Sequence, residues 1–234
     1  MKKLIVIYVF FVSIITSFAQ IQLKVPGVNW DELYNFDKYN VFKVQFFAKN
    51  NKLMRTMEYR TYYQTEGQNF VLKLVTNGKV SGMETIIDKK NEVAIQIFSS
   101  GRGAKPYYNT GGYKFPTEAE LKKLELTPID ETKKILGFDC RKYTYVYKKI
   151  FGEVWITDMI PLSNDLGIFR AAKMASVHNT FSVGGFVMEM TTEDVKGGKT
   201  VMATVSLKNT EQYTVNLKGV KMNTAKNKIN YFTF

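Results

Sequence analysis

The sequence has almost no histidine and almost no cysteine, because His178 and Cys140 are the only residues of either type. A single cysteine cannot form a disulfide within the chain. A zinc site needs several histidine, cysteine or acidic side chains close together, and one of each about forty residues apart does not supply such a set. We therefore expect no metal site. We expect Cys140 to be a buried apolar thiol in a strand.

Signatures of common catalytic sites are also missing. The glycine-flanked stretch 101–103 lacks the third glycine and the strand-then-helix setting of a dinucleotide site, and no Gly-x-Ser-x-Gly elbow occurs. Glu153, Asp158 and Asp165 could serve as acid–base carboxylates, but acidic residues at strand ends and turns are usually solvated. The sequence therefore predicts a protein that is not an enzyme, with no catalytic residues and no cofactor.

Positive charge is in excess, with 33 Lys and Arg against 21 Asp and Glu. The lysines are spread along the chain and often alternate with apolar residues, which is typical of solvated strand faces and edges. A clustered basic arm, which would indicate nucleic acid, is missing. We therefore expect no nucleic-acid partner, whereas peripheral contact with an anionic membrane surface stays open.

The N-terminal segment resembles a secretory signal peptide. Lys2 and Lys3 precede an apolar run, Leu4–Ile15, and Ser17 and Ala19 then place small residues at the two positions that a signal peptidase reads. The alternative is a membrane anchor, but the run is shorter than the roughly 20 residues that span a bilayer. We expect residues 1–19 to be a signal peptide cleaved between Ala19 and Gln20, and the remainder to be exported to the periplasm or the cell exterior.

The rest of the chain is dominated by apolar and polar residues that alternate with a period of two. Turn signals stand between the alternating segments, as at Asp88–Asn91 and at Gly197–Gly198. Such short connections favour antiparallel neighbours, because parallel strands need long crossovers. The sequence predicts a mainly β (α+β) protein, built as a single curved antiparallel sheet or open half-barrel of about ten strands. Residues 20–222 are expected to form one domain, and 223–234 a tail or last strand.

Few helices are expected. Thr117 and Glu120 form a capping box for a helix at 117–125, and Asn29 begins a weaker segment through Tyr34. Residues 163–175 show helical spacing. We expect two or three such short helices to pack on the concave face of the sheet. The stretch 99–114, rich in glycine, asparagine and tyrosine, is predicted to be a loop.

Stripes of tyrosine and methionine along the strands indicate where a ligand could bind. One face of a sheet must be buried, so an ordinary core is the simplest interpretation. A sheet this long offers more apolar face than two or three short helices can cover, and methionine suits adaptable binding surfaces. The predicted ligand-binding residues are Phe46, Met57, Tyr59, Leu72, Tyr145, Met188 and Met190, with Leu166 and Phe169 of segment 163–175 as a lid.

Three segments carry a resemblance to a known family. They are ILGFDCRKY at 135–143, VWITD at 154–158 and FVMEM at 186–190, and the IID pattern at 86–88 agrees with them. Over about 83–222 the chain resembles the domain-of-unknown-function 4412 family of exported Gram-negative proteins, whose architecture is similar to the LolA and LolB lipoprotein carriers. The resemblance implies an open, curved antiparallel half-barrel with helices plugging its concave side and acyl chains beneath them. It implies no catalytic residues.

Two functions follow from these features. The first is a non-enzymatic periplasmic binder or carrier of a lipid or other apolar ligand in the cell envelope. The second is a structural or protein-interaction module of the envelope with a fully packed core, whose partner would contact the loops, where Tyr107, Tyr108 and Tyr113 stand out.

Overall fold

The computed structural model describes residues 28–64, 69–76, 79–99, 105–112, 126–147, 149–160, 183, 185–208 and 210–224. Within these ranges every regular element is a strand and none is a helix. Accordingly, the described residues include no helix that is long and apolar enough to cross a membrane. The helices expected at 117–125 and 163–175 lie outside the described residues.

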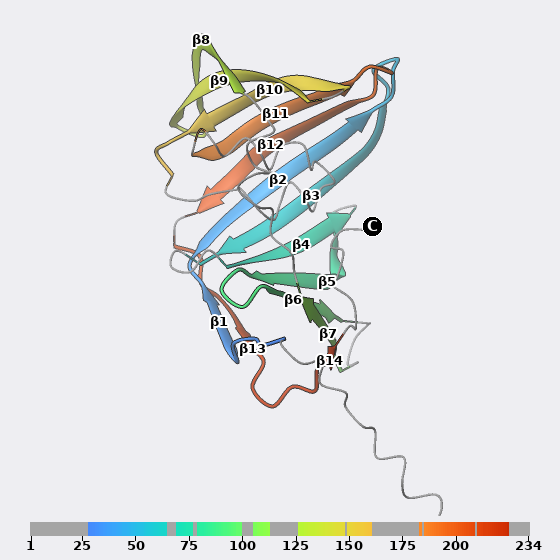
Figure 1. Ribbon diagram of the computed structural model, residues 1–234, viewed down its shortest axis with the longest axis vertical. Coiled ribbons are helices and arrows are strands. Elements are labelled where there is room, and N and C mark those ends of the chain that lie inside the picture. Colours follow the sequence, from blue (N-terminus) through green and yellow to red (C-terminus); the bar gives the residue numbers. More distant parts are fainter. Residues whose placement is uncertain are drawn as a thin grey trace, which may run out of the picture.

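Two antiparallel meanders build the sheet (Figure 1). The first contains β2 (Lys38–Phe47), β3 (Leu53–Tyr63), β4 (Phe70–Thr76), β5 (Lys79–Asp88), β6 (Val93–Phe98) and β7 (Tyr107–Gly112). The second contains β8 (Leu126–Ile135), β9 (Phe138–Tyr147), β10 (Ile150–Thr157), β11 (Phe186–Asp194) and β12 (Lys199–Lys208). Alternation within several of the strands, such as β3 and β10, separates the two faces of the sheet, as the sequence predicts.

The two meanders become one sheet because their first and last strands pair. β12 lies antiparallel to β2, with partners running from Lys199 and Phe47 to Lys208 and Tyr39. The resulting order is β14-β7-β6-β5-β4-β3-β2-β12-β11-β10-β9-β8, in which β14 (Asn223–Thr224) is parallel to β7 and all other pairs are antiparallel. The sheet does not close, since β8 and the β7–β14 end remain as its two edges. The predicted open antiparallel architecture is confirmed, with more strands than expected.

One face of the sheet lies on the inside of a strong bend. Tyr63 of β3 and Phe186 of β11 belong to strands three spacings apart, about 14 Å in a flat sheet, yet their ring centroids are 6.4 Å apart. We call the hydrophobic cluster centred on this side the inner cluster: Phe42, Val44, Met57, Tyr59, Tyr63, Phe70, Leu72, Leu74, Ile87, Ala94, Ile135, Cys140, Tyr145, Val154, Ile156, Ile160, Phe186, Val187, Met188, Met190 and Met202.

The other face of β4–β6 carries a second, smaller core. A ribbon of β1 (Leu33–Phe36) and β13 (Tyr213–Asn216) packs against it and forms a two-stranded sheet of its own. We call this set the outer cluster: Tyr34, Phe36, Val71, Ile86, Ile95, Ile97, Val215, Leu217 and Met222. Figure 1 shows the ribbon beside β4–β6, at the end of the molecule away from β8. Strands β4–β6 are therefore buried on both faces.

Two sequence-based expectations are corrected by these strands. The segment through Tyr34 is not helical, because Leu33–Phe36 pairs with β13. Within the expected loop 99–114, residues 107–112 form β7, held by six residue pairs with β6. The turns expected at Asp88–Asn91 and Gly197–Gly198 are confirmed, since they join β5 to β6 and β11 to β12.

Gly152 provides a test of the pairing between β10 and β11. A Cβ at this position would lie 1.9 Å from the carbonyl oxygen of Thr191 and 2.9 Å from the Tyr145 hydroxyl. We expect Gly152→Ala to destabilise the fold by about 2–4 kcal/mol, because backbone must move in the middle of the sheet. The measurement is urea unfolding followed by circular dichroism.

Gly137→Ala is the matched control. Gly137 has a φ of +88° and open space around it, so alanine there costs only backbone strain, about 1 kcal/mol. Equal losses of stability in the two variants would contradict the close approach at Gly152.

Candidate functional site

The residues predicted to bind a ligand lie on one side of the sheet. Six of the seven, namely Met57, Tyr59, Leu72, Tyr145, Met188 and Met190, are members of the inner cluster, and Phe46 is half-buried against it. They come from β2, β3, β4, β9 and β11, so the bend of the sheet gathers strands from both meanders around one apolar surface. The proposed lid residues Leu166 and Phe169 lie outside the described residues.

Strand register aligns the methionines of this surface in a row. Met190 is opposite Met202, Met202 is opposite Val44, and Val44 is opposite Met57. Directly opposite residues on one face of a sheet are in side-chain contact. This methionine row crosses four strands, β11, β12, β2 and β3. Sequence reasoning missed Met202 and Val44, because only the register of β12 against β2 reveals that they belong to the row.

The tyrosines of the inner cluster are neutral. Burial raises the pKa of Tyr59 to about 12, and burial likewise raises the pKa of Tyr145 to about 12. The Tyr145 hydroxyl lies 2.6 Å from the Thr192 hydroxyl, and the Tyr59 hydroxyl donates to the sulfur of Met57 at 3.7 Å. Phenols in this state add hydrogen-bonding capacity to the surface without adding charge.

Charge is excluded from the inner cluster. Among the described residues the one charged side chain that is buried is Asp88, and its partner Tyr34 belongs to the outer cluster. Ion pairs instead occupy outward positions of the same strands: Lys73 with Glu84, Lys133 with Glu189, and Lys142 with Glu131 and Glu153. An isolated charge brought against the inner cluster would lose its hydration without gaining a partner.

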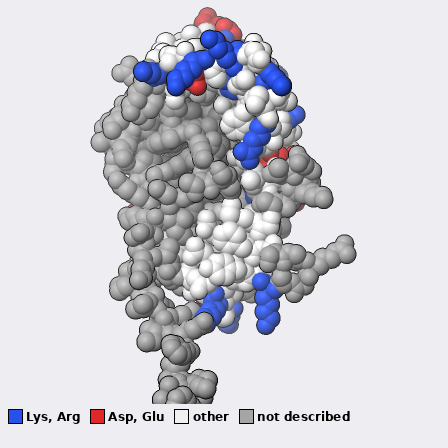
Figure 2. Space-filling view, turned by 90° about the vertical axis from the view of Figure 1, so that its right-hand side faces the viewer, with Lys and Arg blue, Asp and Glu red and all other residues white. Residues whose placement is uncertain are grey.

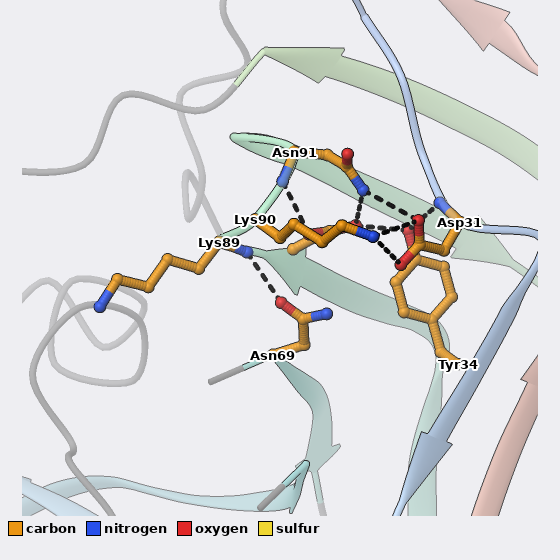
Figure 3. A network of polar contacts seen from close by, with 7 residues as sticks. Asp31, Tyr34, Asn69, Lys89, Lys90 and Asn91 are labelled. Carbon is orange, nitrogen blue, oxygen red and sulfur yellow. Dashed lines mark hydrogen bonds and ion pairs between the residues drawn. The ribbon is translucent and has the colours of Figure 1, made fainter. Parts of the chain in front are cut away.

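The buried carboxylate Asp88 is a structural element of the outer face. Figure 3 shows the network around it. The Tyr34 hydroxyl donates to Asp88 at 2.8 Å, and the Asn91 side-chain amide donates to the same oxygen at 2.6 Å. The backbone N–H of Asn91 donates to the other oxygen, so both oxygens are occupied. Burial, and then the hydrogen bond to Asp88, raise the pKa of Tyr34 far above its ordinary range.

A second hydrogen bond from a tyrosine hydroxyl to a carboxylate attaches β13 to the sheet. The Tyr213 hydroxyl donates to Glu84, whose other oxygen lies 3.1 Å from the Lys73 ammonium. That ammonium also stands 3.8 Å from the centre of the Tyr213 ring, and the ring stacks on Tyr62 at 4.4 Å. These groups satisfy one another, which indicates attachment of the ribbon rather than catalysis.

Within the described ranges the remaining reactive groups do not assemble into a catalytic set. Cys140 is buried, its thiol donates to the carbonyl of Phe138, and burial raises its pKa, so the expected buried thiol is confirmed. Glu153 pairs with Lys142 at the surface. The described residues contain no group of three or more potential metal ligands. His178 and Asp165 lie outside the described part of the chain.

Three hairpin turns meet at one end of the sheet. The turn after β2 lies against the turn after β11, because a Cβ on Gly197 would be 2.9 Å from the side chain of Lys49. The third turn joins β9 to β10, and the carbonyl of its Lys149 accepts the N–H of Val195 in the turn after β11. We call the exposed cations on and beside these turns the basic rim: Lys49, Lys52, Arg55, Lys149 and Lys196. Figure 2 shows blue side chains gathered at this upper end.

Exposed apolar side chains accompany the basic rim. Met54 and Val195 are each 64% exposed and Leu53 is 46% exposed. The nearby carboxylate of Asp194 accepts the N–H groups of Lys196 and Gly198 within its own turn. An open depression lies beside Ala48–Asn50, at the rim and not on the inner cluster.

Comparisons with known proteins give weak similarities. No protein-family model matches the chain, and no curated protein matches it. Two crystal structures of PNGF-II align with a TM-score of 0.42 at 16% and 17% identity, over 81% of this chain and about a third of PNGF-II. MucB in complex with MucA(peri) aligns at 0.42 with 10% identity, over 75% of this chain and 50% of MucB.

The lipoprotein LppX of Mycobacterium tuberculosis aligns with a TM-score of 0.37 at 10% identity, over 78% of this chain and 90% of LppX. Similarities this low transfer no function. Membership of the domain-of-unknown-function 4412 family stays a prediction.

The buried tyrosines predict how the protein unfolds in alkali. The folded state holds the protons of Tyr59 and Tyr145 to about pH 12, whereas an unfolded chain releases them near pH 10. Their contribution, roughly 2–3 kcal/mol each, is therefore complete below pH 10 and is lost as the pH rises to 12. We expect Tyr59→Phe to move alkaline unfolding to higher pH, as measured by absorbance at 295 nm together with circular dichroism.

Tyr107→Phe serves as the control, because Tyr107 is 54% exposed and should not change the transition. Release of all tyrosine protons near pH 10 from protein that is still folded would contradict the burial of Tyr59 and Tyr145.

Proposed function

We propose that the protein is an exported, non-enzymatic binder or carrier of a lipid or other apolar ligand in the cell envelope, and that the ligand lies on the inner face of the sheet. The observation that carries this proposal is the composition of the inner cluster. Methionine, tyrosine and branched aliphatic side chains form a continuous surface there, without a charged group, on a sheet that stays open at both edges.

The physical chemistry of this surface suits an alkyl chain. Each methylene group moved from water to an apolar surface gains about 0.8 kcal/mol, so a chain of moderate length binds tightly without any specific contact. Methionine side chains are unbranched and polarizable, and they adapt to ligands of different shape. The methionine row is therefore the proposed floor of the site, together with Tyr59, Leu72, Tyr145 and Met188.

Phe46 is the proposed entrance residue. It is the one predicted site residue that is only half-buried, and it lies in β2 next to the turn that bears Lys49 and Lys52. A ligand that arrives at the basic rim would therefore meet Phe46 before the inner cluster. Export, with cleavage between Ala19 and Gln20, and a single domain over 20–222 remain part of this proposal.

The basic rim supports peripheral contact with an anionic membrane. No ion pair joins its five cations to an acid among the described residues, and apolar side chains stand between them. Lysine near an anionic bilayer contributes about 1 kcal/mol, and exposed apolar side chains can enter the headgroup region. A carrier that collects its ligand from a membrane would benefit from such a contact beside its entrance.

An envelope interaction module is the second candidate. It is favoured by strand β7, which carries no charged residue and pairs with β14 only at Asn109 and Thr110. An uncharged sheet edge accepts a strand from a partner more readily than a charged one. Two results together would favour this candidate over the first: cross-linking in cells through Tyr107 captures a single partner at one copy per copy of this protein, and the purified protein carries no lipid.

The ligand proposal is tested by native mass spectrometry and by a fluorescent apolar probe. We expect protein purified without detergent to carry an apolar small molecule and, after its removal, to bind N-phenyl-1-naphthylamine. Phe46→Ala should weaken probe binding about tenfold, because a buried aromatic contact is lost. Phe151→Ala is the control, since Phe151 is exposed on the outward side of β10. Empty protein that binds no probe would refute the proposal.

The membrane contact is tested with vesicles. We expect binding to vesicles of phosphatidylcholine and phosphatidylglycerol but not to phosphatidylcholine alone, with a decrease at high salt. Reversal of three rim charges, with Lys49→Glu, Lys52→Glu and Lys196→Glu together, should weaken binding more than tenfold. The control changes net charge equally at exposed sites elsewhere, with Lys105→Glu, Lys134→Glu and Lys218→Glu. Equal losses in both triple variants would argue against a rim-specific contact.

A further inference from the structure

Three polar side chains interrupt the apolar inner face. Asn40 and Thr61 are fully buried and Tyr63 is 4% exposed. No hydrogen bond reaches the amide oxygen or nitrogen of Asn40, the hydroxyl of Thr61 or the hydroxyl of Tyr63 from any described residue. We call these three residues the polar patch.

Register places the polar patch in one spot. Asn40 of β2 is directly opposite Thr61 of β3, and Tyr63 follows Thr61 by two residues and so points to the same side. Aromatic rings surround this spot. The Tyr63 ring lies 6.2 Å from Phe70 and 6.4 Å from Phe186, and Phe42 stacks on Phe186 at 6.1 Å.

Three other buried threonine hydroxyls of the sheet have partners, in contrast to the polar patch. Thr204 donates to the carbonyl of Val187, Thr110 donates to the carbonyl of Ala94, and Thr157 accepts the N–H of Met159. A buried polar group without a partner disfavours the folded state, and native proteins retain few of them. Four unpaired atoms together therefore indicate a place where a partner other than the described residues completes the hydrogen bonds.

The polar patch is neutral. Burial raises the pKa of Tyr63 well above its ordinary value, and the nearby Thr61 hydroxyl is the one group that acts in the opposite direction. The two hydroxyls do not reach hydrogen-bond geometry, so each keeps its capacity for another partner. Lys43, Glu58 and Lys73 occupy outward positions of their strands. Lys38 is opposite Tyr63 at the start of β2, where its ammonium pairs with Asp37 at 3.8 Å, and Arg55 is opposite Phe46 at the other end of the two strands.

We propose that the polar patch binds the head of the apolar ligand, and that this head is uncharged and carries both a hydrogen-bond donor and an acceptor. A long-chain alcohol, a monoacylglycerol or a primary fatty amide fits this description. The Asn40 amide would donate through its nitrogen and accept through its oxygen, while Thr61 and Tyr63 complete the set. None of the three residues of the polar patch carries a charge that could pair with a carboxylate or ammonium head. This inference rests on the proposed function and specifies its ligand class.

Competition with one chain length and three heads tests the proposal. Full-length chain is expressed and the purified protein is loaded with N-phenyl-1-naphthylamine, which is then displaced by dodecan-1-ol, dodecanoate or dodecyltrimethylammonium at pH 8. We expect the alcohol to bind at least tenfold more tightly than either ion. Thr61→Val and Asn40→Leu should weaken alcohol binding about tenfold and leave the affinity for the probe unchanged. Thr204→Val, whose hydroxyl has an internal partner, should leave the preference intact.

Stability of the ligand-free protein gives an independent readout. Because Thr61→Val removes an unpaired buried hydroxyl, we expect the melting temperature to rise by roughly 2–4 °C. Thr204→Val removes a hydroxyl that has a hydrogen-bond partner, so it should lower the melting temperature. A structural role for Thr61 would predict a loss of stability in both variants.

The outcomes separate this inference from the proposed function. Binding of probe and of all three amphiphiles with equal affinity, or a destabilised Thr61→Val, would overturn the polar patch as a head-group site while the apolar site stands. Failure of probe and of every amphiphile to bind would overturn both.

Discussion

The pairing of β2 with β12 is the constraint on which the rest of the structure depends. It joins the start of one meander to the end of the other, from Lys38–Phe47 to Lys199–Lys208. Every row of side chains across the inner face passes through this seam, including the methionine row. Because the seam connects residues so far apart in sequence, its closure costs chain entropy that only the completed apolar surface offsets.

The two faces of the sheet differ in the side chains that they carry. The buried inward positions hold apolar and neutral polar side chains, so this surface can accommodate an apolar neighbour. Outward positions hold lysine and glutamate in alternation, as in Lys133 with Glu189, where Trp155 also lies 4.3 Å from the Lys133 ammonium. Exposed pairs of this kind add little stability, but they keep strand faces and edges soluble. The ribbon of β1 and β13 covers the apolar outward region of β4–β6.

Sequence alternation predicted much of the inner face, because a period of two assigns Met57, Tyr59, Tyr145, Met188 and Met190 to buried positions without knowledge of their partners. It could not reveal how strands are ordered. Met202 joins the methionine row only through its register.

The strands that sequence analysis missed are those without clear alternation. Residues 107–112 contain two glycines and an asparagine, and 126–135 is largely polar, so backbone pairing with a neighbour rather than side-chain pattern makes them strands. Asn40 and Thr61 gave no signal for a similar reason, since an asparagine and a threonine become notable only when register puts them opposite each other in a buried place.

The single thiol of Cys140 is enclosed in the hairpin of β8 and β9 at the edge of the sheet. Alkylating reagents can therefore reach it only when that hairpin opens. The rate at which Cys140 is labelled thus reports how often this edge of the sheet opens.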